Sequence, residues 1–204
     1  MTQPVNPVDR STVAARLRDF PRRASDRQDL KRAAVAVCIT EDGGVLSLLI
    51  IRRAPRLRAH AGQLALPGGR LDPGETAPDG ALRELQEELG LTLKPDAVLG
   101  LLDDYVTRSG YVITPVVCWA VDAGEPTPAE TEVAQVHQVS LADLDVEPRF
   151  ITIPESNAPV IQLPLLDRYL HAPTGAIVYQ FCQVACRGLV TRVAHFEQPV
   201  FAWR

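Results

Sequence analysis

The sequence lacks any long apolar run and any apolar leader at its start. No stretch of the 204 residues approaches the ~18 consecutive apolar residues of a membrane-spanning helix. The first ten residues, MTQPVNPVDR, are polar and contain two prolines, so they do not resemble a signal peptide. We therefore expect a cytoplasmic protein with no membrane partner.

Cysteine is also scarce, and its spacing argues against the common zinc sites. The four cysteines form no CxxC pair, and no histidine stands at zinc-ligand spacing from them. All of them lie in apolar segments, which favours buried reduced thiols over a disulfide or a metal site. They are Cys38, Cys118, Cys182 and Cys186.

A strong net charge is absent as well, since the formal value is -4, and we expect no nucleic-acid partner. The charge is nevertheless uneven. Residues 1–32 carry eight Arg or Lys against four Asp, and a second basic stretch contains Arg52, Arg53, Arg56 and Arg58. A basic loop just ahead of an acidic segment suits an anionic ligand held next to a cation, although a solvated loop is the alternative.

The length suits one domain, which buries roughly 70% of the surface that its unfolded chain exposes. We interpret residues 1–32 as an N-terminal basic extension, in which 10–20 form a helix that docks on the main domain, 33–204. A short helix capped by Ser140 is predicted at 140–144. Several strands with few helices between them indicate an α/β fold, a sandwich around a mixed sheet. Strands are predicted at 33–40, 44–53, 98–105, 111–121, 132–139, 176–184 and 191–201.

The stretch ETAPDGALRELQEELG has a clear helix start and stop. Thr76 can cap the first turn, with Asp79 three residues later in the manner of a capping box. Gly90 supplies the left-handed residue that commonly ends a helix. These signals predict a helix over residues 77–89.

The two faces of this helix differ in character. Glu84, Glu87 and Glu88 fall on one arc, and a separate stripe holds leucines that are expected to pack. Like charges one turn apart repel, so a bound cation is one reason to hold the glutamates together, and a solvated acidic surface is the alternative. Carboxylate oxygens in this number suit Mg²⁺ or Mn²⁺. The leucines are Leu82, Leu85 and Leu89.

The loop ahead of the helix, GGRLDPGETAPDG, is rich in Gly and Pro and adds a fourth glutamate, Glu75. Glycines expose backbone N–H groups that can approach phosphate oxygens closely. Gly69, five residues, Glu75, seven residues and the run Arg83–Leu91 resemble the full Nudix box, G-x5-E-x7-R-E-U-x-E-E-x-G-U with U aliphatic. From average residue frequencies, a chance match in a chain of this length is on the order of one in ten million.

This resemblance implies a Nudix fold, an α/β/α sandwich around a mixed sheet, and hydrolysis of a nucleoside diphosphate linked to another group. It implies Mg²⁺ or Mn²⁺ as cofactor and a small-molecule nucleotide as substrate. The general base varies within the family, and Glu130 and Glu132 are candidates outside the box. By resemblance, the catalytic residues are the metal ligands Glu84, Glu87 and Glu88, the positioning residue Arg83 and the loop residue Glu75, while Gly69 shapes the loop.

The segment LIIRRAPRLRAHAGQLALPGG at 49–69 resembles the motif LLTxRSxxxRxxxGxxxFPGG of the coenzyme A pyrophosphatase branch, with departures at Ile50, Ile51, Ala54 and Leu66. The resemblance implies cleavage of coenzyme A or a derivative to 3′,5′-ADP and 4′-phosphopantetheine. Arginine makes forked contacts with phosphate, which suits the 3′-phosphate of coenzyme A. The expected substrate-binding residues are Arg53, Arg58, Gly68, Gly69 and Arg108.

Two alternatives stay open at this point. One is a Nudix hydrolase for ADP-ribose, dinucleotides or (deoxy)nucleoside triphosphates, and the other is an inactive nucleotide-binding module. Homodimer formation is also left open. Near the C-terminus, Phe196, Phe201 and Trp203 are interpreted as core or interface residues more readily than as a base-stacking platform.

Overall fold

The computed structural model describes residues 8–56 and 61–202. In this part of the chain no helix is long and apolar enough to cross a membrane. The helices are α1 (Arg10–Asp19), α2 (Ala77–Leu89) and α3 (Thr174–Phe181), with a π-helical turn at Cys182–Cys186 and 3-10 turns at Pro95–Ala97 and Val200–Ala202. The strands are β1 (Lys31–Asp42), β2 (Val45–Arg53), β3 (Leu64–Ala65), β4 (Gly68–Arg70), β5 (Val98–Leu101), β6 (Tyr105–Val106), β7 (Tyr111–Trp119), β8 (Val133–Ser140), β9 (Arg149–Ile153), β10 (Ser156–Leu165) and β11 (Arg168–His171).

Strands β1 to β8 form one mixed sheet within the described residues. Its central path runs β3-β2-β1-β7-β5, and β8 pairs with β2. β1 lies parallel to β7 and antiparallel to β2. The short strand β4 pairs with β1 so that Gly69 lies opposite Ala34, which fixes the glycine-rich loop beside the centre of the sheet.

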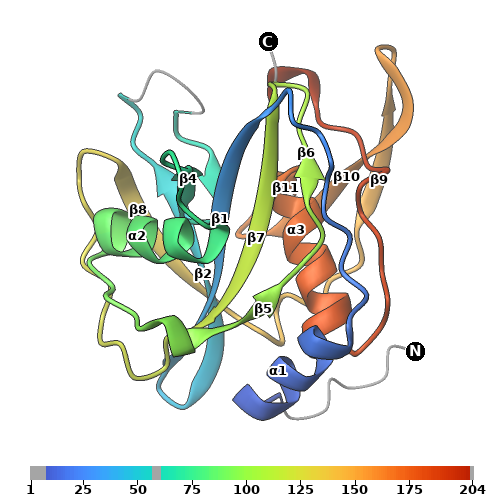
Figure 1. Ribbon diagram of the computed structural model, residues 1–204. Coiled ribbons are helices and arrows are strands. Elements are labelled where there is room, and N and C mark those ends of the chain that lie inside the picture. Colours follow the sequence, from blue (N-terminus) through green and yellow to red (C-terminus); the bar gives the residue numbers. More distant parts are fainter. Residues whose placement is uncertain (1–7, 57–60, 203–204) are drawn as a thin grey trace.

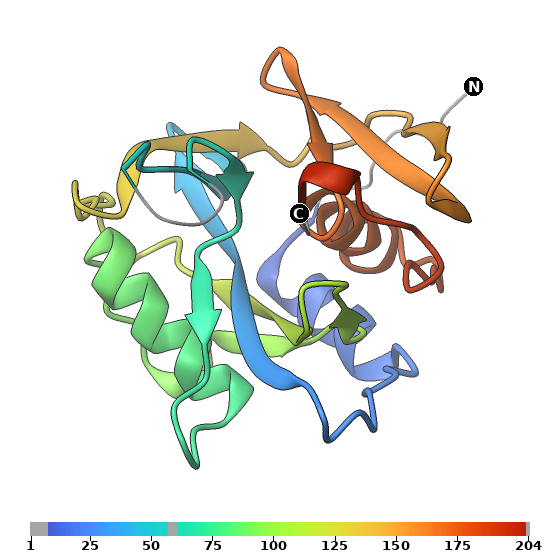
Figure 2. The ribbon, with the colours of Figure 1, turned by 90° about the horizontal axis from the view of Figure 1, so that it is seen from above.

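Helices cover both faces of this sheet (Figures 1 and 2). Helix α2 packs on one face, whereas α1 and α3 pack on the other. In β1, Val37 and Ile39 belong to the α1/α3 side of the core, and Ala36 and Cys38 belong to the α2 side. A strand covered on both faces is apolar at almost every position instead of alternating. The predicted α/β/α sandwich is therefore confirmed.

A second antiparallel sheet, in the order β11-β10-β9, lies beside α3 on the side away from α2 (Figure 2). Sequence analysis did not predict it. Pro159 and Pro164 interrupt β10, and proline usually lowers the expectation of a strand. The loop between β10 and β11 has two residues with positive φ, Leu166 and Asp167, as tight hairpin turns require.

The predicted strand at 176–184 is wrong, because this segment is the helix α3 followed by the π-helical turn. Its residues are apolar at nearly every position. Such a run fits a helix buried on all sides as well as it fits a strand. Ile177, Val178 and Phe181 pack into the core beneath the main sheet, and each is at most 1% exposed.

Two further predictions are wrong. The predicted strand at 191–201 is irregular apart from a bridge between Val160 and Glu197 and the last 3-10 turn. The predicted helix at 140–144 is a turn, in which the Ser140 hydroxyl still accepts the N–H of Asp143 at 3.0 Å.

The other predictions agree with the structure within a few residues, except that the segment 98–105 is divided between β5 and β6. Two of the three residues between these strands, Asp103 and Asp104, are buried carboxylates that join distant parts of the chain. Asp103 is bound by both the side chain of Arg192, at 2.8 Å, and the backbone N–H of Arg23, at 2.7 Å. The four cysteines are free and buried, as predicted.

Candidate active site

Helix α2 begins and ends at the predicted residues. The Thr76 hydroxyl accepts the N–H of Asp79 at 3.3 Å and donates to its carboxylate at 2.6 Å. Gly90 takes the left-handed conformation, with φ of 67°, and closes the helix. Leu85 and Leu89 are fully buried against the sheet and so fix which face of α2 is turned toward the glycine-rich loop.

Two glycines let the loop pass very close to its neighbours. A Cβ at Gly68 would overlap the carbonyl oxygen of Ala34 in β1. A Cβ at Gly69 would overlap the carboxylate of Glu84. Glycine at both positions therefore brings the β4 backbone into contact with the glutamates of α2. The Gly68 N–H donates to Glu88 Oε2 at 3.0 Å.

Arg83 lies among three of the four glutamates and holds them together. Its Nε donates to Glu75 at 2.9 Å, and its Nη1 donates to Glu84 at 2.9 Å and to Glu87 at 2.8 Å. Its Nη2 also donates to the carbonyl of Arg70 at 3.0 Å. The hydrogen bond from Arg83 holds the pKa of Glu75 below its usual value.

The glutamates of α2 do not form one solvated face. The side chain of Glu87 is 56% exposed, that of Glu84 is 13% exposed and that of Glu88 is only 1% exposed. Burial raises the pKa of Glu88 to about 7, although the Gly68 N–H and Arg53 act in the opposite direction. Burial also raises the pKa of Glu84. The three glutamates on the predicted arc thus differ in exposure, from Glu87 at the surface to Glu88 inside the protein.

Arg53 is the one cationic side chain that lies beside Glu88 in the described residues. Its Nη1 is 3.5 Å from Glu88 Oε1. Its Nε is buried and has no hydrogen-bond partner in the described part of the chain. A buried guanidinium N–H without a partner is costly, so this group has capacity for an acceptor on a ligand. Arg58, the other arginine of the motif, lies outside the described residues.

Arg108, which was expected to bind substrate, does not pair with the glutamates of α2. It forms a two-point ion pair with Glu197, with Nε 3.0 Å from Oε1. The residues on either side of it, Thr107 and Ser109, line the cavity described below.

Among the candidate bases, Glu132 lies close enough to Glu84 and Glu88 to influence their pKa values. Glu130 is exposed, and we find no such effect from it in the described residues.

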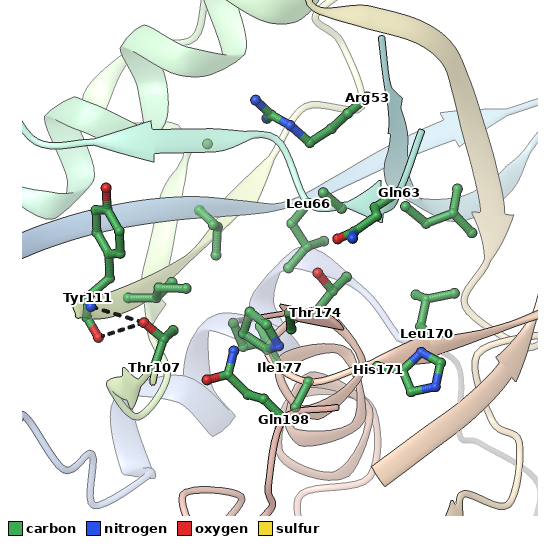
Figure 3. A pocket seen from close by; sticks show the side chains of 18 of the residues that line it. Arg53, Gln63, Leu66, Thr107, Tyr111, Leu170, His171, Thr174, Ile177 and Gln198 are labelled. Carbon is green, nitrogen blue, oxygen red and sulfur yellow. Dashed lines mark hydrogen bonds between the residues drawn. The ribbon is translucent and has the colours of Figure 1, made fainter. Parts of the chain in front are cut away.

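A cavity of about 670 Å³ opens beside Gly68 and Gly69 and separates the main sheet from the C-terminal part of the chain (Figure 3). This volume suits a small-molecule ligand. Its lining is largely apolar and includes Leu66, which lies between β3 and β4, and Ile177 from α3. Polar groups around it include Arg53, Gln63, Thr107, Tyr111, His171, Thr174 and Gln198.

Sequence analysis missed the second wall of this cavity. That wall comes from β11, from the start of α3 and from residues 198–202. None of these segments carries a motif, and two of them were predicted as parts of strands. The aromatic residues near the C-terminus were the available signal, because Phe201 is 54% exposed and lines the cavity instead of packing in the core.

In the described residues no three His, Cys, Asp or Glu side chains converge as a ready ligand set. Arg83 instead lies between Glu84 and Glu87. The donors nevertheless fit a hard divalent cation, because they are carboxylate oxygens on one helix beside an open cavity. The residues that could hold a cation are Glu84, Glu87 and Glu88, with Glu75 holding Arg83.

Comparison with known proteins agrees with this geometry. The profile of the NUDIX domain matches residues 30–163. Nudix hydrolase 3 of Caenorhabditis elegans is 35% identical over 103 residues, which are 50% of this chain and 43% of that protein. NudL, an uncharacterized Nudix hydrolase of Yersinia enterocolitica, is 38% identical over 96 residues, which are 47% of this chain and 49% of that protein. The chain thus spans about half the length of the curated relatives it matches.

Among solved structures, a MutT/nudix family protein from Enterococcus faecalis aligns with a TM-score of 0.50 at 18% identity. The alignment covers 74% of this chain and 57% of that one, and it supports the fold alone. Family membership rests on the profile match, which covers more than half of the chain. The chain belongs to the Nudix family.

Proposed function

We propose that this protein is a pyrophosphohydrolase that depends on Mg²⁺ or Mn²⁺ and cleaves coenzyme A or a derivative into 3′,5′-ADP and a phosphopantetheine product. The observation that carries the proposal is the meeting of the box residues at one place. Glu84 lies against Gly69, Glu88 is bound by the Gly68 N–H, and the cavity opens beside both glycines.

The metal ligands in this proposal are Glu84, Glu87 and Glu88. A single Nη1 of Arg83 donates to one oxygen of Glu84 and to one oxygen of Glu87, so the second oxygen of each carboxylate can serve a cation. The bonds from Arg83 to Glu75 and to the Arg70 carbonyl hold its guanidinium beside the loop. Arg83 and Glu75 then act as positioning residues.

The buried Glu88 is the ligand with the most fixed position. It accepts a hydrogen bond from the Gly68 N–H and lies near Arg53. Burial raises its pKa, and a nearby cation would favour loss of its proton because positive charge stabilises the carboxylate. A bound divalent cation supplies positive charge that neutralises the diphosphate and activates a water. The nearby Glu132 is the better placed candidate for general base, since its charge reaches Glu84 and Glu88.

The substrate assignment is supported by the arginine motif and by the cavity. Arg53 has a buried N–H available for an acceptor, and it lies at the diphosphate end of the site. Of the departures from the motif, Ile51 is buried on the α2 side of the sheet and Ala54 is also buried, and neither lines the cavity, whereas Leu66 does. The Thr and Ser hydroxyls of the motif would therefore not face the cavity, and their absence here is compatible with coenzyme A as substrate.

The test is product identification by chromatography after incubation with Mg²⁺ or Mn²⁺. Coenzyme A, dephospho-coenzyme A, ADP-ribose and deoxynucleoside triphosphates are supplied separately. We expect 3′,5′-ADP from coenzyme A, formed faster than any product from the other compounds. Turnover of ADP-ribose or the triphosphates alone would overturn the coenzyme A assignment and keep the hydrolase. No turnover of any of them would contradict the enzyme assignment.

A further inference from the structure

The charges on the described lining of the cavity have one sign. Three arginines, Arg53, Arg70 and Arg168, line it, and no Asp or Glu does so among the described residues. The whole chain has a formal net charge of -4, so this selection of cations departs from the average surface. A cavity with a largely apolar lining and only positive charges around it suits an anionic ligand that also has an apolar or aromatic part.

Arg53 and Arg168 lie on different elements that line the cavity. Arg53 lies beside Glu88, next to the α2 glutamates. Arg168 comes from β11, in the second sheet, and is exposed. In the described part of the chain Arg168 forms no ion pair, and the two carboxylates that share a second hollow with it, Asp143 and Asp167, do not line the cavity. Arg168 is therefore the cation on the cavity wall that the second sheet provides.

The charge of Arg168 also reaches β8. His137 has a lowered pKa, first because it is partly buried and then because Arg52 and Arg168 act on it. Arg52 and His137 do not line the cavity, so Arg168 is the arginine of the second sheet that a phosphate in the cavity would meet.

Two exposed aromatic residues line the cavity together with Arg168. Tyr169 follows Arg168 in β11 and is 44% exposed, and Phe201 is 54% exposed. The Arg149 guanidinium lies over one face of the Tyr169 ring, 5.7 Å from its centroid, and His171 meets the Phe201 ring edge-on at 5.3 Å between centroids. The exposed part of each ring offers a surface on which a flat heteroaromatic ring can stack.

We propose that Arg168, with the rings of Tyr169 and Phe201, binds the nucleoside end of the substrate and recognises a phosphomonoester on it, apart from the diphosphate. This inference rests on the proposed function and makes Arg168 the residue that favours coenzyme A over dephospho-coenzyme A. It differs from the sequence interpretation, in which Arg53 and Arg58 were expected to contact the 3′-phosphate; Arg58 lies outside the described residues. β11 lies beyond residue 163, where the match to the NUDIX profile ends, so this recognition belongs to the chain's own C-terminal part.

The experiment compares the wild type with Arg168→Gln. The first readout is the ratio of kcat/KM for coenzyme A to that for dephospho-coenzyme A at saturating Mg²⁺. We expect the substitution to lower this ratio roughly ten- to hundredfold, the usual effect of one hydrogen bond to a charged group. Arg18→Gln is the matched control, because Arg18 is an exposed arginine on α1 that does not line the cavity. It should leave the ratio unchanged.

The second readout needs no turnover. Calorimetry without metal compares the binding of 3′,5′-ADP and 5′-AMP, and we expect the preference for 3′,5′-ADP to disappear in Arg168→Gln. Equal losses for both nucleotides, or an unchanged preference, would overturn the proposal. If the wild type hydrolyses no coenzyme A, the proposed substrate fails, and the calorimetric comparison still decides the role of Arg168.

Discussion

The molecule contains two acidic clusters, and they differ in how completely the protein satisfies them. Asp103 and Asp104 lie between β5 and β6 and are 3% and 8% exposed. The glutamates of α2 lie on the other side of the sheet. Both clusters contain arginine, and both are partly or fully buried, so charge and burial alone do not separate them.

The aspartate cluster is saturated with donors. Asp103 binds the side chains of Arg192 and Gln180 and the N–H of Arg23. Asp104 accepts bonds from Arg22 at 2.6 Å, from the Ser25 N–H at 2.8 Å and from Thr114 at 2.8 Å. A fully bonded buried network of this kind fixes structure, and here it attaches the N-terminal segment to the sheet and to α3.

The glutamate cluster has fewer donors than acceptors. One arginine, Arg83, serves Glu75, Glu84 and Glu87, while Glu88 has one backbone N–H and an arginine at 3.5 Å. A carboxylate that is buried with few donors has a raised pKa and gains from a nearby cation. The candidate active site is therefore distinguished from the aspartate cluster by carboxylates that have few hydrogen-bond donors, and not by its acidity.

We expect the largest effect on turnover when two charges are removed from the glutamate cluster. Glu87→Gln combined with Glu88→Gln should lower metal-dependent turnover by about a thousandfold, because two proposed cation ligands lose their charge. Steady-state kinetics measures the loss, and circular dichroism checks that the fold is kept. Glu125→Gln removes an exposed carboxylate elsewhere and is the control. Wild-type activity in the double variant would refute the ligand assignment.

The next largest effect is a loss of stability when a charge is removed from the aspartate cluster. Asp103→Asn should cost about 3 kcal/mol of unfolding free energy, since it leaves the charge of Arg192 without its partner in a largely buried place. Urea unfolding measures this, with the exposed Asp122→Asn as control. The folded variant should keep kcat/KM within about twofold of the wild type. A stable but inactive Asp103→Asn protein would contradict the division between the clusters.

A third prediction concerns pH in the metal-free protein. The pKa of Glu88 is raised to about 7 in the folded state, against an unfolded value of 4.5. Its contribution to stability is therefore complete below pH ~4.5 and is lost as the pH rises through about 7. Glu88→Gln does not titrate, so the variant should gain about 2–3 kcal/mol relative to the wild type between pH 5 and pH 8. Urea unfolding in EDTA at both pH values measures this. A constant difference would show that Glu88 is not destabilised by burial.

The smallest effect is expected at the N-terminal cap of α2, which tests whether the cap positions the glutamates. Thr76→Ala removes the cap of the helix and should cost about 1 kcal/mol of stability. Because Leu85 and Leu89 also anchor α2, turnover should change little. Thr76→Ser keeps the hydroxyl and should behave like the wild type in both assays. A large loss of activity with Thr76→Ala alone would mean that the cap positions the glutamates.

The sequence predicted the parts of this account that depend on local signals. The cap at Thr76, the end at Gly90 and the spacing from Gly69 to Leu91 specify α2 and its loop without reference to the rest of the fold. The sequence also predicted a glycine-rich loop ahead of α2, but the close approach of Gly69 to Glu84 is seen only in the structure.

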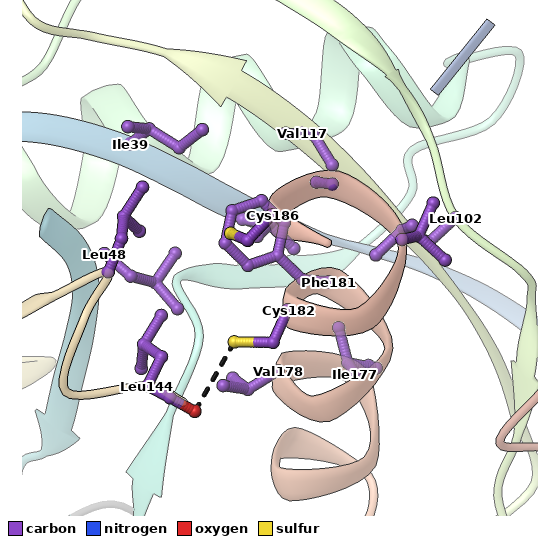
Figure 4. Close-up of a cluster of buried hydrophobic side chains, with 14 of the residues drawn as sticks. Ile39, Leu48, Leu102, Val117, Leu144, Ile177, Val178, Phe181, Cys182 and Cys186 are labelled. Atoms are coloured by element: carbon purple, nitrogen blue, oxygen red, sulfur yellow. Dashed lines mark hydrogen bonds between the residues drawn. The ribbon is translucent and has the colours of Figure 1, made fainter. Parts of the chain in front are cut away.

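The parts that depend on distant contacts were not predictable. Helix α3 is buried between the main sheet and the second sheet, so its apolar residues carry no helical periodicity (Figure 4). The burial of Glu88 depends on where β4 lies, and the ion pair between Arg108 and Glu197 joins residues far apart in the chain. The second wall of the cavity likewise comes from segments without a motif.

The most direct test of the central claim is calorimetric titration of Mn²⁺ into the metal-free protein at pH 7.5. The account predicts that the wild type and Asp103→Asn bind Mn²⁺ with similar affinity, while the double glutamate variant loses at least about tenfold. Unchanged binding in the double variant, or a loss in Asp103→Asn, would contradict the claim that the incompletely satisfied carboxylates of α2 form the cation site.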